Sequence, residues 1–206
     1  VLDYDRDGMP DLFFCQGGDP TMEGNGDRPP STLFRNAPPG RFQNVGEAAG
    51  IGAYEYGKGV AVGDFNADGF EDVYVTNVGR NVLLLNNGDG TFQDITGASG
   101  TGDDLWSTSA AFADLTGDGL LDIYVCNYLA YNPRSPLNCR NSKGEYRICH
   151  PRELPPVPDH FYVNLGDGTF REESVSRGLM GEGNKALGVA VADFNADGAP
   201  DVYVAN

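Results

Sequence analysis

The sequence predicts an all-β protein built from repeated four-stranded antiparallel sheets, on three observations. An acidic nine-residue motif occurs four times, at 3–11, 64–72, 114–122 and 193–201, and a hydrophobic, β-rich run follows each copy. A hairpin motif alternates with it three times. No apolar period of 3.6 residues is long enough for a substantial helix. This repetition indicates a repeat architecture within a single domain over residues 1–206.

The acidic motif has the composition of a cation-binding loop. In the second copy, Asp64, Asn66, Asp68 and Asp72 place side-chain oxygens at positions 1, 3, 5 and 9, and the backbone carbonyl of Phe70 stands at position 7. A glycine at position 6 permits the positive φ that curls the loop. Calcium takes six to eight oxygen ligands, so this arrangement predicts a calcium site.

Two other interpretations fit the motif less well. An EF-hand loop needs a bidentate Glu at position 12 and flanking helices, but position 12 is Val75, and the flanking runs 59–62 and 73–75 favour strands. Asp, Asn and Gly are also ordinary hairpin residues. Acids recur at positions 1, 5 and 9 in all four copies, however, and clustered carboxylates repel one another in a plain turn.

The hairpin motif completes a four-stranded unit. Asn36, Asn86 and Asn164 each precede a phenylalanine by six residues, with a Gly-Asp-Gly or Pro-Pro-Gly turn between. Four antiparallel strands in about fifty residues form one blade of a β-propeller. The first strand of each unit is built from small residues, which suit a crowded axis. In the second unit the expected strands lie at 59–63, 72–76, 82–86 and 91–95.

Spacing separates a constant part of the repeat from a variable one. From hairpin Asn to the next loop the distances are 28, 28 and 29 residues, whereas from loop to hairpin they are 33, 22 and 50. Insertions therefore enter around 17–31 and at 128–159, at the end of the blades opposite the acidic loops. Because propellers close with four to eight blades, we expect an excised arc of a larger ring, in contact with the remaining blades of its parent chain. The predicted blades are 1–46 (partial), 57–97, 107–175 with the insertion 128–159, and 186–206 (partial).

The coupled motifs resemble a known family. The loop followed by Val-Tyr-Val, joined to Asn-x-Gly-Asp-Gly-Thr-Phe, is similar to the FG-GAP or VCBS repeat of integrin α-like β-propellers over essentially the whole chain. The motif sequences are most similar to those of the cartilage acidic protein type, which is often found with an ASPIC/UnbV domain. The resemblance implies structural calcium, a secreted, periplasmic or cell-surface location, and an adhesive or interaction role through the face opposite the loops.

Carried over by position, the resemblance implies up to four calcium ions. Thr116 departs from the acid or amide expected at position 3, and a hydroxyl is a poorer ligand than a carboxylate, so the third site is expected to be the weakest. The implied ligands are the side chains of Asp3, Asp5, Asp7, Asp11, Asp64, Asn66, Asp68, Asp72, Asp114, Thr116, Asp118, Asp122, Asp193, Asn195, Asp197 and Asp201, and the backbone carbonyls of Met9, Phe70, Leu120 and Ala199.

The four cysteines are of two kinds. Cys139 and Cys149 lie within the longer insertion and predict a disulfide that staples it, consistent with an oxidising compartment. A metal site formed with the two histidines is the alternative, but the paired Cys-x-x-Cys spacing is missing. Cys15 and Cys126 each follow a loop by four residues on a predicted strand, where we expect small packed side chains.

The insertion 128–159 is the predicted partner surface, and a protein or glycan ligand is expected there. It is net basic within a strongly acidic chain and carries tyrosines, and Arg and Tyr are common hot-spot residues. A solvated loop with ordinary charges is the alternative. The residues concerned are Arg134, Arg140, Lys143, Arg147, Arg152, Tyr128, Tyr131 and Tyr146.

The charge of the chain argues against other partners. A formal net charge of −16 argues against binding to nucleic acid or to anionic membranes. The sequence contains no run of eighteen apolar residues, so membrane insertion is not expected. Thirteen of the 30 acidic residues occupy ligand positions, so four divalent ions would bring the net charge to about −8.

No catalytic constellation is visible. The sequence contains neither Gly-x-Ser-x-Gly nor a phosphate-binding loop. The clustered carboxylates could mimic a glycosidase pair, but their fixed loop spacing favours ligation. We therefore expect a non-enzymatic, calcium-stabilised binding module. A carbohydrate-binding or carbohydrate-active propeller and a scaffold module of a larger secreted enzyme are the alternatives.

Overall fold

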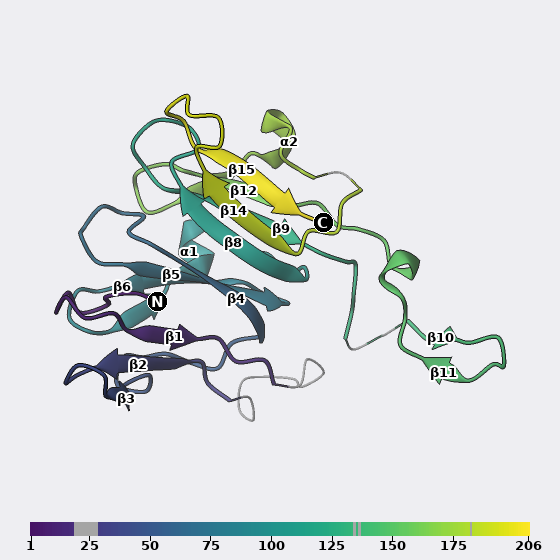
Figure 1. Ribbon diagram of the computed structural model, residues 1–206, viewed down its shortest axis with the longest axis horizontal. Helices are drawn as coiled ribbons and strands as arrows, with labels where there is room; N and C mark the ends of the chain where they lie inside the picture. The colour runs from purple at the N-terminus through teal and green to yellow at the C-terminus, as the bar shows by residue number, and fades with distance from the viewer. Residues whose placement is uncertain (19–28, 134, 136, 182) are drawn as a thin grey trace.

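The computed structural model describes residues 1–18, 29–133, 135, 137–181 and 183–206. They form four antiparallel sheets in chain order and a short two-stranded arm (Figure 1). The chain is an all-β propeller fragment with two complete and two partial blades, as the sequence predicts. The first sheet contains β1 (Leu12–Phe14), β2 (Thr32–Asn36) and β3 (Phe42–Asn44); the second contains β4 (Tyr56–Gly63), β5 (Asp72–Val78), β6 (Val82–Asn86) and β7 (Phe92–Asp94). The third contains β8 (Ser107–Ala113), β9 (Asp122–Asn127), β12 (His160–Asn164) and β13 (Phe170–Glu172); the fourth contains β14 (Gly188–Ala192) and β15 (Asp201–Ala205).

The two complete sheets have the same meander topology. Their strand orders are β4-β5-β6-β7 and β8-β9-β12-β13, with antiparallel neighbours throughout. The first strand pair is longer than predicted, because β4 begins at Tyr56 and β5 continues to Val78. A register shift between Gly57 and Gly59 accommodates the extra length.

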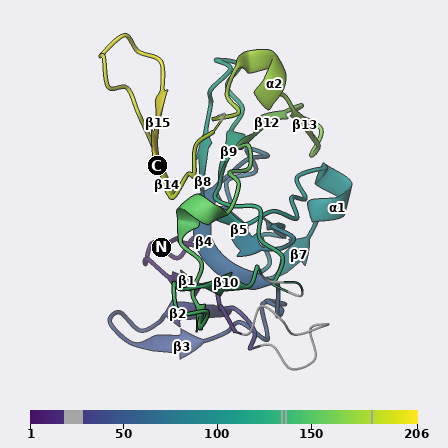
Figure 2. The ribbon, with the colours of Figure 1, turned by 90° about the vertical axis from the view of Figure 1, so that its right-hand side faces the viewer.

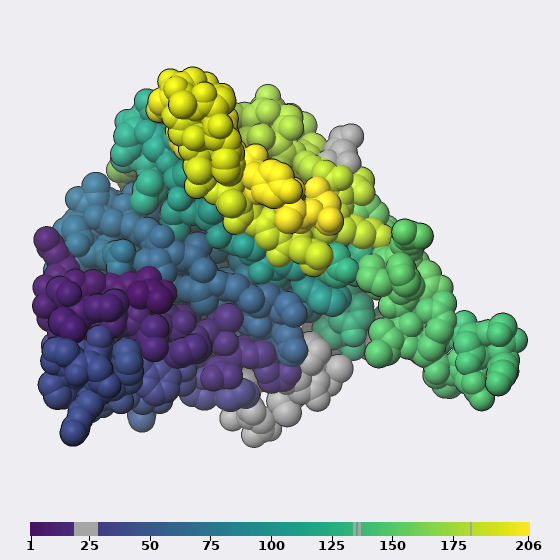
Figure 3. Space-filling view, viewed as in Figure 1, coloured from purple at the N-terminus to yellow at the C-terminus, as the bar shows by residue number. Residues whose placement is uncertain are grey.

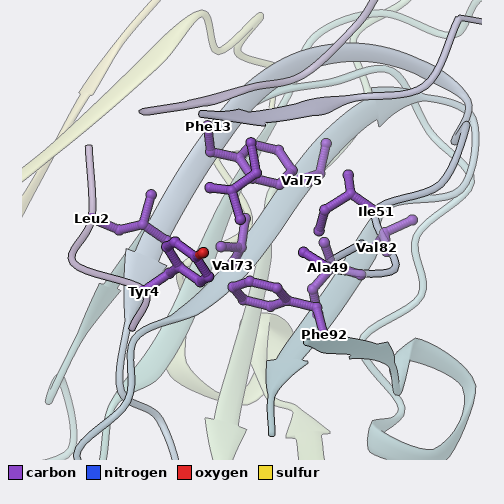
Figure 4. Close-up of a cluster of buried hydrophobic side chains, with 11 residues drawn as sticks. Leu2, Tyr4, Phe13, Ala49, Ile51, Val73, Val75, Val82 and Phe92 are labelled. Carbon is purple, nitrogen blue, oxygen red and sulfur yellow. The ribbon is translucent and has the colours of Figure 1, made fainter. Parts of the chain in front are cut away.

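Apolar layers between neighbouring sheets hold the blades together. All seven residues of β5 are buried, because each face of this strand packs against a different blade. Val73 and Val75 belong to the cluster shared with the first blade (Figure 4), whereas Tyr74 belongs to the cluster shared with the third. This two-sided burial explains why apolar residues follow one another at Val73, Tyr74 and Val75 instead of alternating with polar ones.

The fourth sheet is packed on one face only. Val202 and Val204 of β15 pack against the cluster formed by Tyr124, Phe161 and their neighbours. The intervening Tyr203 is 62% exposed. Alternation along the strand therefore marks an inner and an outer face.

A single helical turn follows the last strand of each complete blade, which the sequence pattern did not predict. These turns are α1 (Thr96–Ser99) and α2 (Ser174–Arg177), and the strand expected at 91–95 ends at Asp94. Each helical turn ends at a left-handed glycine, Gly100 with φ 77° and Gly178 with φ 69°. Each of these glycines follows the phenylalanine of its hairpin by eight residues. The repeat pattern therefore contains the glycine that ends the helical turn, although it does not indicate the turn itself.

The two ends of the blades differ. In Figure 1 the β4–β5 and β14–β15 turns lie at the left end, whereas the arm projects at the right end. The arm consists of β10 (Cys139–Arg140) and β11 (Tyr146–Arg147), followed by the 3-10 helix η1 (Pro151–Glu153). Figure 2 views the molecule from the arm side, with η1 in front of the strands. The part of the chain that the structure describes contains no helix long and apolar enough to cross a membrane.

Candidate cation loops

Each of the four acidic motifs forms a tight loop whose ends lie side by side in antiparallel pairing. Three of them connect β4 to β5, β8 to β9 and β14 to β15. The first precedes β1 and is closed by a bridge between Leu2 and Asp11. The predicted ligand residues of each copy are thus gathered within one hairpin loop, while the four loops stay separate.

The same backbone contacts shape every loop. The glycine at position 6 donates its N–H to the carboxylate at position 1, over 3.0, 2.8, 2.9 and 2.8 Å in the four copies. The residue at position 7 donates to the carboxylate at position 5, over 2.8 to 2.9 Å. The position-6 glycines have φ between 82° and 90°, which explains their recurrence.

Position 4 is a constraint that sequence reasoning missed. Arg6, Ala67 and Ala196 have φ of 56°, 56° and 61°, and Gly117 has 77°. Positive φ is uncommon outside glycine, so three copies hold a strained residue there. The strain is tolerated because the inward carboxylates specify the path of the chain. Of the four residues at position 4, only Gly117 is of a type that indicates a positive φ in the sequence.

In the first three copies, the aspartate at position 9 anchors the loop to its blade. Asp72 is fully buried and accepts the N–H of Phe65 in its own loop, over 3.2 Å, and that of Asn86 in β6, over 2.8 Å. Burial raises its pKa to about 7, and the charges of Asp68 and Asp64 add to the shift, against the two backbone hydrogen bonds. Asp11 and Asp122 make the corresponding contacts, and burial raises their pKa values as well.

All four loops gather carboxylate oxygens of the kind that a hard cation takes as ligands, and the first and third also contain buried side-chain oxygens without a hydrogen-bond partner. In the first loop, one oxygen each of Asp3, Asp5 and Asp11 lies within 4.8 Å of the others. Oδ1 of Asp3 and Oγ1 of Thr116 are buried without a hydrogen-bond partner. Buried oxygens without a donor are costly unless another ligand meets them. The residues present therefore fit a calcium ion, whose positive charge would offset the repulsion among the carboxylates.

In the first loop, a positively charged side chain contacts the carboxylates. The Nε atom of Arg35, on β2, lies 2.6 Å from Asp5 Oδ2, and its Nη2 lies 3.1 Å from Asp7 Oδ2. The corresponding residues of the next two blades are Leu85 and Val163. This guanidinium would compete with a bound metal ion for the carboxylates at positions 3 and 5.

The hairpin asparagines clamp the loop of one blade to the next, a role that the sequence did not reveal. Asn86 Nδ2 donates to the carbonyls of Tyr4, over 2.9 Å, and Glu71, over 3.2 Å. Its Oδ1 accepts the N–H of Gly88. Asn164 repeats the pattern with the carbonyl of Phe65, over 2.8 Å. The spacing of the asparagine from its phenylalanine was visible in the sequence, but its partner in another blade was not.

At the end of the blades opposite the acidic loops, a second set of polar contacts closes the connection between the second and third strands. The N–H of Asn77 donates to Asn81 Oδ1 over 2.8 Å, and that of Asn127 donates to Asp159 Oδ1 over 2.7 Å. Asp159 stands immediately before β12, after the whole insertion. This clamp fixes both ends of the insertion, so its length can vary without disturbing the blade.

The remaining predicted residues are placed as follows. Cys139 and Cys149 form a disulfide with an S–S distance of 2.05 Å, which confirms the predicted staple. Neither histidine joins it in a metal site, because sulfurs bonded to each other are not thiolate ligands and His160 Nδ1 lies 2.8 Å from Asp103 Oδ2. Cys126 is buried and Cys15 half-buried, both as free thiols. Arg134 of the predicted partner surface lies outside the described residues.

The chain matches the family model of the FG-GAP-like repeat over residues 3–75, 64–125 and 155–204. These segments cover well over half of the sequence, so the chain belongs to the FG-GAP-like repeat family. Each segment includes at least one acidic loop and ends on or just after the second strand of a blade. No curated protein matches the chain.

Proposed function

We propose that this chain is a calcium-stabilised propeller segment whose loops bind up to four calcium ions in a structural role. The observation that carries the proposal is the set of buried oxygens without donors among clustered carboxylates, at Asp3 and Thr116. The loop residues supply oxygens at the positions that a calcium ion prefers. When bound, the ion would neutralise the carboxylates and hold the turn between two strands.

We further propose an interaction role for the segment outside the reducing cytosol. The disulfide between Cys139 and Cys149 is the support, because such bonds persist in oxidising compartments. A binding role suits an arrangement in which the loops stabilise one end of the blades and the arm projects at the other. The closer likeness to the cartilage acidic protein type, and the absence of catalysis within this segment, remain predictions.

Thermal unfolding with and without a chelator tests the structural role of calcium. At free calcium a hundredfold above its Kd, each site stabilises the folded state by about 2.7 kcal/mol, which corresponds to about 5 to 11 °C in Tm for a chain of this size. We expect Tm to fall by at least that amount when calcium is removed. An unchanged Tm would contradict the proposal.

A loop variant tests where the calcium binds. Asp64→Asn combined with Asp68→Asn removes two charges from the second loop, so calorimetric titration is expected to show one site fewer. The matched control is Asp89→Asn, because Asp89 is an exposed aspartate of the neighbouring hairpin that binds Thr91. The control is expected to leave the stoichiometry unchanged, and equal stoichiometry in both variants would exclude the second loop as a site.

A further inference from the structure

A cavity of about 660 Å³ lies between the blades and the insertion, at the end opposite the acidic loops. Its inner wall includes Tyr56 and Lys58 at the start of β4 and Trp106 immediately before β8. Its outer wall comes from the insertion and includes Ile148 and Cys149. Two segments that are far apart in sequence therefore form one site.

Aromatic side chains gather around the single tryptophan of the protein. The ring of Trp106 lies 5.3 Å from that of Tyr128 and 5.2 Å from that of Tyr131, between centroids. Lys58 Nζ lies 5.7 Å from the Trp106 ring and 5.3 Å from the Tyr56 ring. The cavity therefore has an apolar aromatic wall with one ammonium group beside it.

The outer wall presents apolar side chains to solvent. Ile148 is 95% exposed and Leu137 is 51% exposed. Both line the cavity, and the disulfide of the adjacent Cys149 holds this wall in place. Figure 3 shows the arm, which begins two residues after Leu137 and ends just before Ile148, projecting from the body of the molecule. Exposed large apolar groups beside an apolar cavity are characteristic of a surface that a ligand covers.

Lys58 gives this cavity an available positive charge. Within the described residues, Lys58 forms no ion pair. The other cation of the cavity, Arg147, is already bound to Glu153 through both terminal nitrogens, over 2.9 and 2.6 Å. An ammonium group at an aromatic wall, in a chain of net charge −16, can offer its N–H groups to an anionic ligand.

We propose that this cavity binds an acidic peptide segment, with an apolar side chain against Trp106 and Ile148 and a neighbouring carboxylate on Lys58. The inference names the partner class for the interaction role proposed above. A peptide fits better than a sugar because the outer wall is aliphatic at Leu137 and Ile148, where an apolar side chain would pack and sugar hydroxyls would be left without hydrogen-bond partners.

Tryptophan fluorescence provides a direct assay, because Trp106 is the only tryptophan. The probes are blocked pentapeptides with a central leucine flanked by two glutamates or by two glutamines, titrated into the calcium-loaded protein. We expect the glutamate peptide to bind about tenfold more tightly than the glutamine peptide. In Lys58→Gln this preference is expected to disappear, whereas Lys143→Gln, on the arm outside the cavity, is expected to retain it.

Three results would overturn the proposal. They are no change in Trp106 emission at millimolar peptide, an unchanged glutamate preference in Lys58→Gln, and a response to an oligogalacturonate probe but to neither peptide. Tm is measured with and without chelator on the same preparation. A calcium-dependent Tm without peptide binding would reject this site alone, whereas peptide binding with a calcium-independent Tm would reject the role of the loops.

Discussion

Arg35 distinguishes the first loop from the other three. Its guanidinium contacts Asp5 and Asp7 at 2.6 and 3.1 Å, where a metal ion would need the same oxygens. From sequence, Thr116 alone predicted which site is weakest. The structure adds a second candidate, because an arginine inside the first loop must be displaced before calcium can use both carboxylates.

Replacing this arginine is expected to strengthen calcium binding at the first loop. In Arg35→Leu, which copies Leu85 of the next blade, the displacement cost disappears, so we expect the affinity of one site to rise about tenfold. Calorimetric titration measures it. Arg80→Leu is the control, since Arg80 pairs with Asp94 on β7. Identical titration curves for wild type and Arg35→Leu would show that the arginine does not compete.

His160 introduces a pH dependence at the opposite end of the blades. Burial alone would lower its pKa, but the hydrogen bond and charge of Asp103 outweigh burial and raise the pKa above its usual value. The negative charges of Glu172 and Asp159 raise this pKa as well. The folded pKa lies above the unfolded one, so the stabilisation is complete below about pH 6.5 and is lost as pH rises through the folded pKa.

The corresponding test compares two histidine variants. Wild type is expected to lose the stability that His160 contributes as the pH rises above about 6.5, whereas His160→Gln should lack this component when urea unfolding is compared at each pH. His150→Gln is the matched control, because His150 caps η1 on the exposed insertion. The explanation fails if wild type and His160→Gln differ by a constant amount as the pH rises.

The hairpin that follows each β6-type strand acts as a clamp between blades. Asn86 satisfies two carbonyls and one N–H while only 1% exposed. The Gly-Asp-Gly turn next to it is held by its own contacts, such as Thr91 with Asp89. Asn86 thus joins the second blade to the loop of the first, together with Glu71, whose carboxylate accepts the N–H of Asp3 over 2.7 Å.

Removing this clamp is expected to weaken the contact between the first two blades. Asn86→Ala leaves buried carbonyls without a donor, which costs about 2 to 4 kcal/mol of unfolding free energy. Asn87→Ala removes an exposed side chain bound to Thr91 and should cost less than about 0.5 kcal/mol. Urea unfolding of the calcium-loaded protein measures both. Equal costs for the two variants would contradict the inter-blade role.

Strand order and repeat length were predictable from the alternation of acidic loops and hairpins. The exact strand ends were not, because β4 and β5 continue past their apolar cores until the contact of Asn77 with Asn81 closes the turn. The helical turn at Thr96 also escaped prediction. Its four residues show no periodicity, and its position depends on a hydrogen bond from the N–H of Leu83 to Thr96 Oγ1.

The whole molecule carries a formal charge of −16, concentrated in loops at one end of the blades. Without bound cations, repulsion among these loops destabilises the folded chain, and dissolved salt screens it. Raising sodium chloride from about 0.01 to 0.15 M is therefore expected to raise Tm by several degrees in chelator. With saturating calcium the rise should be much smaller, and equal rises in both buffers would contradict this account.

The repeat, the propeller class and the candidate ligand set all follow from local pattern. A loop of nine residues folds on itself, so its oxygen positions and glycines can be identified without knowledge of the rest of the chain. Other features depend on contacts between distant residues. Arg35 reaches a loop 28 residues away, Asn86 reaches a carbonyl 82 residues away, and Asn164 reaches one 99 residues away. The aromatic cavity likewise needs the insertion folded against two blades. Such contacts leave no period in the sequence, because they depend on how blades stack in space and not on how each strand and loop is composed.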